Sequence, residues 1–222
     1  MATGVVLLAA GSGNRFGGRT PKQFLPFNGE PLFVASLRVF SSVASVTEII
    51  LVAPPGRASQ IRRRLPRLSA RLAVSVVDGG SFRGASVRNG VKALSAAVSV
   101  VLIHDAARPM VTADIVRRVE SAARRTGSSL AAWPLADTLK KEGPRRRVGR
   151  TVARDGLWVA QTPQGFRRDV ALKCLMFPRP GATDDVALAE SRRLPVELVE
   201  GSPINIKVTT PHDLRLCRAL CP

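Results

Sequence analysis

The sequence predicts an α/β protein in which a mainly parallel central sheet lies between two layers of helices. Short apolar runs rich in Val, Ile and Leu recur along the chain, and they are nearly continuous rather than alternating. Strands that are buried on both faces of a parallel sheet have this pattern. Segments with helical periodicity lie between the runs, and alternating strands and helices are typical of three-layer folds with right-handed crossovers.

The individual elements follow in order from the same patterns. Strands are expected at residues 4–10, 48–53, 72–77, 99–107 and 128–135. Helices are expected at 31–42, with Pro31 as the first helical residue, at 84–97, and at 112–125 behind a Thr112 cap. The remaining elements are residues 157–166, two further helical patterns, a short strand at 195–201, the segment 205–209 and a last helix that opens at Pro211.

Residues 136–156 interrupt this alternation. They are polar and highly charged, and they show no apolar face of either helical or strand period. One interpretation is a disordered insertion. The other is a hairpin arm that extends from the domain and, in an oligomer, enters a neighbouring subunit. In both cases we expect residues 1–222 to form a single domain that contains this segment.

The chain has 222 residues and a formal charge of +18, from 34 basic and 16 acidic residues. This charge favours anionic partners: a nucleotide, a phosphorylated metabolite, nucleic acid or a membrane surface. Compositional bias is the alternative, because most arginines occur in runs such as 62–71 and 140–150 that are typical of solvated faces. The runs contain no aromatic residues on which bases could stack, which argues against a dedicated nucleic-acid-binding protein.

Neither a membrane segment nor an exported protein is predicted. No apolar run reaches the roughly 18–20 residues that a membrane span needs. Residues 4–10 lead into a glycine-rich loop rather than a cleavage site, unlike a signal peptide. The cysteines are odd in number and lack metal-ligand spacing: Cys174, Cys217 and Cys221. We therefore expect a reduced, cytoplasmic compartment.

The loops that follow the strands are the candidate binding positions, because ligands of parallel α/β sheets bind at the carboxyl ends of the strands. The first such loop, within residues 7–24, is rich in glycine, and its Arg15 and Lys22 can place positive charge on a phosphate chain. It lacks the third glycine of G-x-G-x-x-G, and Lys22 follows a proline, unlike the P-loop lysine. An ordinary glycine-rich turn with exposed basic residues is the alternative.

The second loop is residues 78–90, where Gly79 and Gly80 end a strand and Ser86 is expected to start a helix. A tight backbone with a nearby hydroxyl suits recognition of a base edge through N–H and C=O groups. A simple turn followed by a helix cap would give the same pattern.

The third loop is residues 104–109, where Asp105 ends a buried strand beside Arg108. The carboxylate could order a metal ion or a substrate hydroxyl, or it could form a buried ion pair. We expect His104 to be packed in the core rather than catalytic.

Seven stretches, taken together, resemble the methylerythritol-phosphate cytidylyltransferase family of the non-mevalonate isoprenoid pathway. They are "LAAGSGNRFGGRTPKQF", "GGSFRGASV", "HDAARP", "DTLKK", "LWVAQTPQGF", "TDD" and "NIKVTTPHDL". The resemblance spans nearly the whole chain and implies a Rossmann-like nucleotidyltransferase fold with a protruding β-arm. It also implies transfer of the cytidylyl group of CTP to 2-C-methyl-D-erythritol 4-phosphate. Ribitol-phosphate cytidylyltransferases share much of this signature, so ribitol 5-phosphate stays open as the acceptor, as does another sugar-phosphate nucleotidyltransferase activity.

The resemblance assigns the nucleotide-binding residues. Those expected to contact CTP are Ala9, Ala10, Gly11, Gly79, Ser86 and Asp105. Ser81 departs from the pattern, because relatives often carry an acidic residue there. The triphosphate would be held by three cationic side chains with a catalytic role: Arg15, Lys22 and Lys207.

The resemblance also assigns the acceptor site. Asp105 and Arg108 would hold the polyol phosphate, and Asp105 is the expected ligand of Mg²⁺ or another divalent cation. Thr162 would line the same pocket. Thr138 and Arg154 match arm positions that reach the acceptor in the partner subunit of a homodimer. An acceptor phosphate is already ionised near neutral pH, so the reaction needs no general base and depends on positioning and electrostatics.

Overall fold

The computed structural model describes residues 2–11, 16, 21–178 and 180–221. Seven strands form the central sheet in the order β11-β7-β10-β6-β1-β4-β5. They are β1 (Ala2–Leu8), β4 (Val46–Ala53), β5 (Ala73–Asp78), β6 (Val98–Asp105), β7 (Ser128–Pro134), β10 (Trp158–Arg167) and β11 (Glu197–Glu200). Neighbouring strands are parallel except where β10 pairs with β6 and β7. The prediction of a mainly parallel sheet is confirmed.

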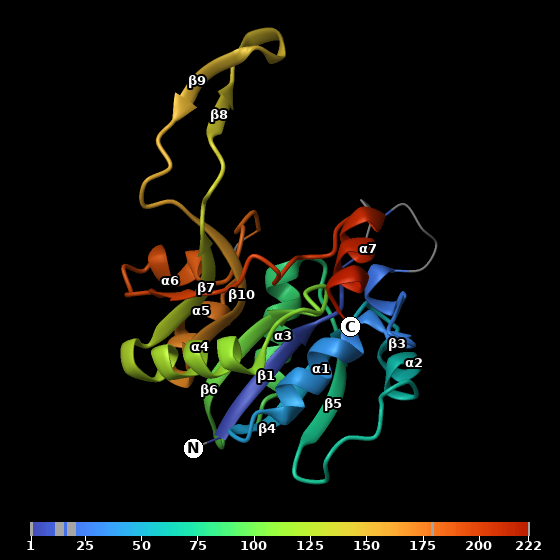
Figure 1. The fold of residues 1–222 in the computed structure, drawn as a ribbon. Coiled ribbons are helices and arrows are strands. Elements are labelled where there is room, and N and C mark those ends of the chain that lie inside the picture. The colour runs from blue at the N-terminus through green and yellow to red at the C-terminus, as the bar shows by residue number, and fades with distance from the viewer. Residues whose placement is uncertain (1, 12–15, 17–20, 179, 222) are drawn as a thin grey trace.

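Helices cover both faces of the sheet (Figure 1). One face packs against α1 (Leu32–Ser42), α2 (Ala58–Arg62) and α4 (Ala113–Thr126), and the other against α3 (Arg83–Ala93), α5 (Arg168–Leu175) and α6 (Ala187–Glu190). Successive β1 residues serve opposite layers, since Leu7 lies in the first core cluster and Val6 in the second, both fully buried. Because both faces of the strand are buried, its sequence is continuously apolar.

A smaller cluster attaches the C-terminal helix to the domain. There Leu214 of α7 (Pro211–Leu220) lies in one buried cluster with Phe27 of the short hairpin formed by β2 (Pro26–Phe27) and β3 (Glu30–Pro31). The helix begins with a capping box in which Thr210 and Asp213 exchange hydrogen bonds. The cap residue, Thr210, lies three residues after Lys207. The cap therefore anchors the end of the irregular segment that contains Lys207.

Some element boundaries differ from the predictions. Pro31 has an extended ψ of 140° and is the N-cap of α1 rather than its first helical residue. Helix α3 already begins at Arg83, because only Phe82 before it is extended, so Ser86 lies in the first turn. The predicted Thr112 cap is confirmed, since its hydroxyl accepts a hydrogen bond from the Ile115 N–H.

Residues 136–156 form a hairpin arm and not a disordered insertion. In this arm β8 (Leu139–Glu142) pairs antiparallel with β9 (Val148–Val152), and the 3₁₀ turn η3 (Pro144–Arg146) joins them. Figure 1 shows the arm extending well beyond the body of the protein. Almost all of its side chains are exposed in the single chain.

The three cysteines are free thiols: Cys174 and Cys217 are buried and Cys221 is half-buried. Within the described ranges, no helix combines the length and the apolar character needed to cross a bilayer.

Candidate active site

A pocket of about 680 Å³ opens at the carboxyl ends of the parallel strands. Its wall includes Leu8 from the end of β1, Pro55 from the loop after β4, Gly80 from the loop after β5 and Asp105 from the end of β6. This is the edge at which ligands bind in open α/β sheets. The loops that the sequence singled out therefore meet in one cavity.

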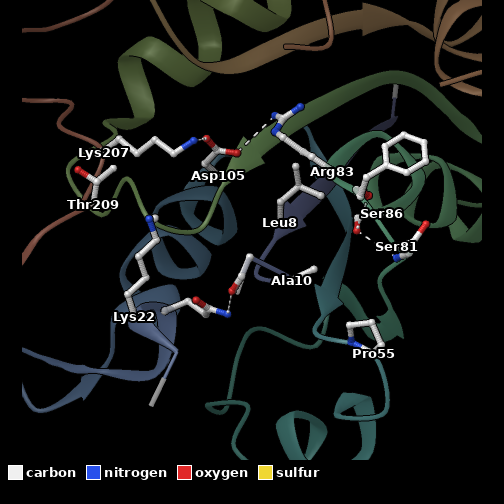
Figure 2. A pocket seen from close by; sticks show the side chains of 15 residues that line it. Leu8, Ala10, Lys22, Pro55, Ser81, Arg83, Ser86, Asp105, Lys207 and Thr209 are labelled. Atoms are coloured by element: carbon white, nitrogen blue, oxygen red, sulfur yellow. Dashed lines mark hydrogen bonds and ion pairs between the residues drawn. The ribbon is translucent and has the colours of Figure 1, made fainter. Parts of the chain in front are cut away.

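The pocket has two chemically different sides (Figure 2). Lys22, from the 3₁₀ turn η2 (Lys22–Phe24), and Lys207 extend into it from one side. Pro55, Ser81 and Ser86 lie on the other side, where the lining side chains are neutral apart from Arg83, whose guanidinium is paired with Asp105 and Asp185. A ligand with a polyanionic end and a neutral end fits this division, because lysines can neutralise the first while backbone groups and hydroxyls contact the second.

Asp105 is the charged centre of the pocket. Its Oδ2 accepts a hydrogen bond of 2.6 Å from Lys207 Nζ, and its Oδ1 lies 3.3 Å from Arg83 Nη2. The Arg83 guanidinium also binds Asp185 Oδ1 at 2.7 Å. Figure 2 shows Asp105 between the two cationic side chains. The ion-pair interpretation of Asp105 is thus correct for the single chain, and both of its oxygens face cations that could exchange partners when a ligand binds.

The pKa values of the Asp105 and Asp185 carboxyl groups are shifted in opposite directions. Burial alone would raise the pKa of Asp105, but the charges of Arg83 and Lys207 outweigh it and hold that pKa well below its usual range. Burial does raise the pKa of Asp185, despite the opposing charge of Arg83. Asp105 therefore presents a carboxylate to the pocket at every physiological pH.

The glycine-rich loop supplies backbone groups at its start. Ala10 and Gly11 line the pocket. Ala9 does not, because it is buried, its N–H donates to the Val52 carbonyl at 2.8 Å, and its carbonyl accepts from Gln23 Nε2. Gln23 also donates to the Gly11 carbonyl at 3.1 Å and so fixes the shape of this turn. The geometry supports nucleotide contacts by Ala10 and Gly11 but gives Ala9 a structural position beneath them.

Lys22 is brought to the pocket as predicted, whereas Arg15 lies outside the described residues. The order of residues along the chain explains the position of Lys22. The 3₁₀ turn places the buried Gln23 against the β1 loop, and the preceding lysine then faces the cavity.

The second loop approaches the pocket one residue later than predicted. Gly80 lines the cavity, and Gly79 lies behind it, where an added Cβ would be 2.7 Å from Ala10 Cβ and 2.9 Å from the Ala53 carbonyl oxygen. Gly79 is thus needed for close packing of two loops. Ser86 lines the pocket, and its hydroxyl accepts from the Gly80 N–H at 3.1 Å and donates to the Phe82 carbonyl at 3.2 Å.

Arg108 and Thr162 lie next to Asp105, although neither is among the residues that line the pocket. The Arg108 guanidinium donates to the carbonyls of Asn205 at 2.7 Å and Ala160 at 3.3 Å. Thr162 is buried, and its hydroxyl accepts from the Asp105 N–H at 3.2 Å. His104 is completely buried, as predicted, and burial lowers its pKa to about 4 against the opposing charge of Asp105.

Thr138 and Arg154 lie on the arm and are exposed. The Arg154 guanidinium donates to the Ala136 carbonyl, across the two legs of the arm. Neither residue lines the pocket of its own chain. A role at an acceptor site would therefore require a second subunit.

Sequence reasoning missed several residues that shape the pocket: Gln23, Pro55, Phe82, Arg83 and Thr209. Arg83 is the most consequential, because it joins Asp105 to Asp185. The only signal was its place in the glycine-rich stretch "GGSFRGASV", and no local spacing indicates that it faces a carboxylate 22 residues away.

The residues present suit a magnesium ion that arrives with phosphate groups rather than a preformed metal centre. In the described part of the chain, no group of three or more His, Cys, Asp or Glu residues could hold a metal ion. Mg²⁺ commonly takes one or two carboxylates together with substrate phosphates and water. Asp105 provides one such carboxylate at the pocket wall.

Comparisons with known proteins identify the family of this chain. The family described as 2-C-methyl-D-erythritol 4-phosphate cytidylyltransferase matches residues 3–221. A relative of that name from Salinibacter ruber is 41% identical over 221 residues, which cover 98% of this chain and 92% of the relative. Another from Alkaliphilus oremlandii is 38% identical over 216 residues, 96% of this chain and 92% of the relative.

A solved structure extends the similarity to the fold. The crystal structure of 2-C-methyl-D-erythritol 4-phosphate cytidylyltransferase from Thermus thermophilus superposes with a TM-score of 0.80 at 33% identity. The match covers 99% of this chain and 98% of that chain. Matches in sequence and fold over almost the full length show that this chain belongs to the 2-C-methyl-D-erythritol 4-phosphate cytidylyltransferase family.

Proposed function

We propose that this protein transfers the cytidylyl group of CTP to 2-C-methyl-D-erythritol 4-phosphate and releases pyrophosphate. One observation carries the proposal: a two-sided pocket with two lysines on one side and, on the other, neutral groups beside an arginine that is paired with two carboxylates, in a chain that belongs to this family. The neutral side would receive the nucleoside and the lysines the triphosphate. Ribitol 5-phosphate is the alternative acceptor, and it would use the same chemistry.

The nucleotide would lie across the carboxyl ends of the strands. Backbone groups of Ala10 and Gly11 would approach the phosphates and ribose, and Gly80 and Ser86 would face the base and ribose. Gly80 would make the contact that the family resemblance assigned to Gly79, because Gly80 lines the cavity. Ser81, on the same wall, is a neutral side chain that can both donate and accept a hydrogen bond.

The reaction itself is a displacement at phosphorus. An oxygen of the acceptor's phosphate forms a bond to the α-phosphorus of CTP while the bond from that phosphorus to the α,β-bridging oxygen breaks. The electron pair of that bond leaves with pyrophosphate. Negative charge therefore grows on the bridging and equatorial oxygens, and fixed cations near them lower the barrier.

Lys22 and Lys207 would supply this charge, and Arg15 would join them. Lys207 Nζ lies 2.6 Å from Asp105 Oδ2, and this ion pair orients the ammonium in the pocket. When the triphosphate enters, Lys207 would exchange part of its contact with Asp105 for phosphate oxygens. Asp105 would then be available to the acceptor and to Mg²⁺, while Arg83 still keeps it ionised.

Mg²⁺ would neutralise phosphate charge and help align the attacking and leaving oxygens. Asp105 is the side chain that would hold it together with the phosphates. Its acceptor role and its role toward the metal are compatible, since a carboxylate has two oxygens and about four lone-pair sites.

We further propose that the enzyme acts as a homodimer whose arms complete the acceptor sites. An isolated two-stranded hairpin is marginally stable in water. At the base of the arm, Leu157, Trp158 and Val159 are 41%, 38% and 48% exposed, an apolar surface that a second subunit would cover. Thr138 and Arg154 would then reach the acceptor bound in the partner's pocket.

Pyrophosphate release from CTP in the presence of Mg²⁺ tests the activity. 2-C-methyl-D-erythritol 4-phosphate and ribitol 5-phosphate are offered separately, with ATP, GTP and UTP as nucleotide controls. Release with CTP and the first acceptor alone supports the proposal. Release with ribitol 5-phosphate instead keeps the mechanism and changes the acceptor, and no release with either contradicts the assignment.

Subunit mixing tests the dimer. Arg154→Ala subunits and Lys22→Ala subunits should each be nearly inactive as homodimers. Heterodimers should contain one site with both wild-type residues and so regain part of the activity. Absence of rescue in confirmed heterodimers would show that each site is built from one chain.

A further inference from the structure

The acceptor side of the pocket rests on a buried hydrogen-bond chain that the proposed catalytic steps do not use. Three hydrogen bonds link, in this order, Asp105, Thr162, His104 and Arg108. The Asp105 N–H donates to Thr162 Oγ1 at 3.2 Å, Thr162 Oγ1 lies 2.9 Å from His104 Nδ1, and His104 Nε2 lies 3.2 Å from the Arg108 carbonyl oxygen. The chain thus connects the two residues predicted to hold the acceptor.

The partners of His104 determine where its proton lies. A carbonyl oxygen can only accept, so His104 Nε2 must carry the hydrogen that binds the Arg108 carbonyl. The imidazole is 0% exposed and has one hydrogen in its neutral form. His104 Nδ1 is therefore unprotonated and accepts its hydrogen bond from the Thr162 hydroxyl.

This assignment uses the only hydrogen of the Thr162 hydroxyl. A hydroxyl has one donor and two acceptor lone pairs. In Thr162 the donor goes to His104 Nδ1, and one lone pair receives the Asp105 N–H. An ionised phosphate oxygen requires a donor, so the Thr162 hydroxyl cannot bind one without breaking the chain.

The surroundings keep the imidazole in place. Phe40 of α1 packs edge-on against the ring, with ring centroids 5.0 Å apart and an interplanar angle of 63°. Ser36 of the same helix donates to the Arg108 carbonyl at 3.2 Å, so that carbonyl has both lone pairs occupied. The Arg108 N–H donates to the Asp105 carbonyl at 2.9 Å and closes the turn.

We propose that His104 and Thr162 are positioning residues for the acceptor site. A neutral His104 with its proton on Nε2, together with the Thr162 hydroxyl, holds the turn from Asp105 to Arg108 in the shape that places the Asp105 carboxylate at the pocket wall and Arg108 beside it. Thr162 thereby acts on the acceptor phosphate through Asp105, because its hydroxyl has no hydrogen left to donate to a phosphate oxygen. The proposal rests on the proposed function for its kinetic tests, whereas the proton position can be measured without any activity.

The first experiment is ¹⁵N NMR of the histidine side chains in the full-length protein without substrate. The chain contains only His104 and His212, and the exposed His212 is assigned with the His212→Gln variant. The expected spectrum shows a protonated Nε2 and an unprotonated Nδ1 for His104 at neutral pH. A proton on Nδ1 would overturn the proposal whether or not the enzyme proves to be a cytidylyltransferase.

The second experiment separates positioning from direct contact by kinetics. Thr162→Val should lower kcat/KM for the acceptor by about 10- to 100-fold, the scale of a displaced catalytic group, with a smaller effect on CTP binding, because Asp105 is one of several residues assigned to the nucleotide. Thr162→Ser keeps the hydroxyl and should recover most of the loss. Thr126→Val is the matched control, because the Thr126 hydroxyl bonds the Ala122 and Ser128 carbonyls far from the pocket.

A double-mutant cycle decides between the two roles. His104→Phe keeps a ring against Phe40 but removes the nitrogen that accepts from Thr162. If both residues act as one unit, Thr162→Val has little further effect in the His104→Phe background. If Thr162 contacts the substrate, its substitution costs the same factor in both backgrounds, and the proposal fails. Thermal denaturation of each variant verifies that the comparison is made on folded protein.

Discussion

Replacing Lys207 with methionine should separate the electrostatic role of the pocket from its contribution to stability. Methionine keeps a long unbranched side chain and removes the ammonium. In the free protein the change breaks one ion pair, the 2.6 Å contact with Asp105, in which the lysine side chain is 36% and the aspartate side chain 11% exposed. Arg83 remains 3.3 Å from the same carboxylate, so Asp105 keeps one counter-ion.

The exposure of the pair sets the expected loss of stability. Exposed pairs contribute about 0–1 kcal/mol and breaking a buried pair costs about 3–5 kcal/mol, so this partly exposed pair should cost about 1–3 kcal/mol. The expected loss in catalysis is larger. Removal of one preorganised charge that acts on the transition state costs about 2.7–4 kcal/mol, or 10²–10³ in kcat.

Two assays test these values together. The free energy of unfolding is obtained from urea denaturation, and kcat from pyrophosphate release at saturating CTP and acceptor. Lys173→Met, at an exposed position of α5 outside the pocket, is the matched control and should change neither quantity. A Lys207→Met enzyme that is folded and retains kcat within about threefold, worth about 0.7 kcal/mol, would refute the assignment.

Three further predictions concern the structure around the pocket. Gly79→Ala should cost about 1–3 kcal/mol of stability in urea denaturation and weaken CTP binding, because the new Cβ would meet Ala10 and the Ala53 carbonyl. Glu120→Gln should lower the free energy of unfolding by about 1–3 kcal/mol and leave kcat unchanged, because the carboxylate binds Thr3, Ser45 and Arg124 at the amino ends of the strands. Burial acts to raise the pKa of Asp213, but hydrogen bonds from Thr209 and Thr210 lower it from 3.8 to about 2. The stabilisation by Asp213 should therefore be complete above its unfolded pKa and lost as the pH falls through about 2, measured as a shrinking stability difference between wild type and Asp213→Asn.

The outcomes that contradict these predictions are equally specific. Unchanged urea midpoints for Gly79→Ala would mean that the two loops separate without cost. A large fall in kcat for Glu120→Gln would mean that the amino ends of the strands are coupled to the pocket. A difference between wild type and Asp213→Asn that stays constant from neutral pH to pH 2 would mean that folding does not lower the pKa of Asp213.

The sequence predicts the sheet well because strands that are buried on both faces have continuously apolar sequences. The run from Val5 to Leu7 is continuously apolar since its residues alternate between two cores. It predicts the arm less completely. The absence of an apolar face in residues 136–156 is compatible with disorder, and only the pairing of β8 with β9 distinguishes the hairpin.

The sequence predicts where the site lies, but not which side chains face the pocket or which of them contact one another. Chain order places the loops at one edge of the sheet, and that rule brings Lys22 and Asp105 together. Which residue of a loop faces the pocket can change with a shift of one position along the chain. For this reason Gly80 lines the pocket and Gly79 packs behind it. Lys207 reaches Asp105 across 102 residues of sequence, and no spacing pattern encodes such a contact.

The pairing of Asp105 with two cations prepares the pocket for its substrates. Unpaired lysines in an empty pocket would be hydrated and mobile, and ordering them around a triphosphate would cost side-chain entropy at the moment of binding. Here ion pairs orient both cations, Lys207 through Asp105 and Arg83 through Asp185. A phosphate that enters needs only to compete with one carboxylate for a cation that is in position. If the triphosphate takes Lys207 in that exchange, the released carboxylate would be free to bind the acceptor, and we therefore expect CTP to bind before the acceptor.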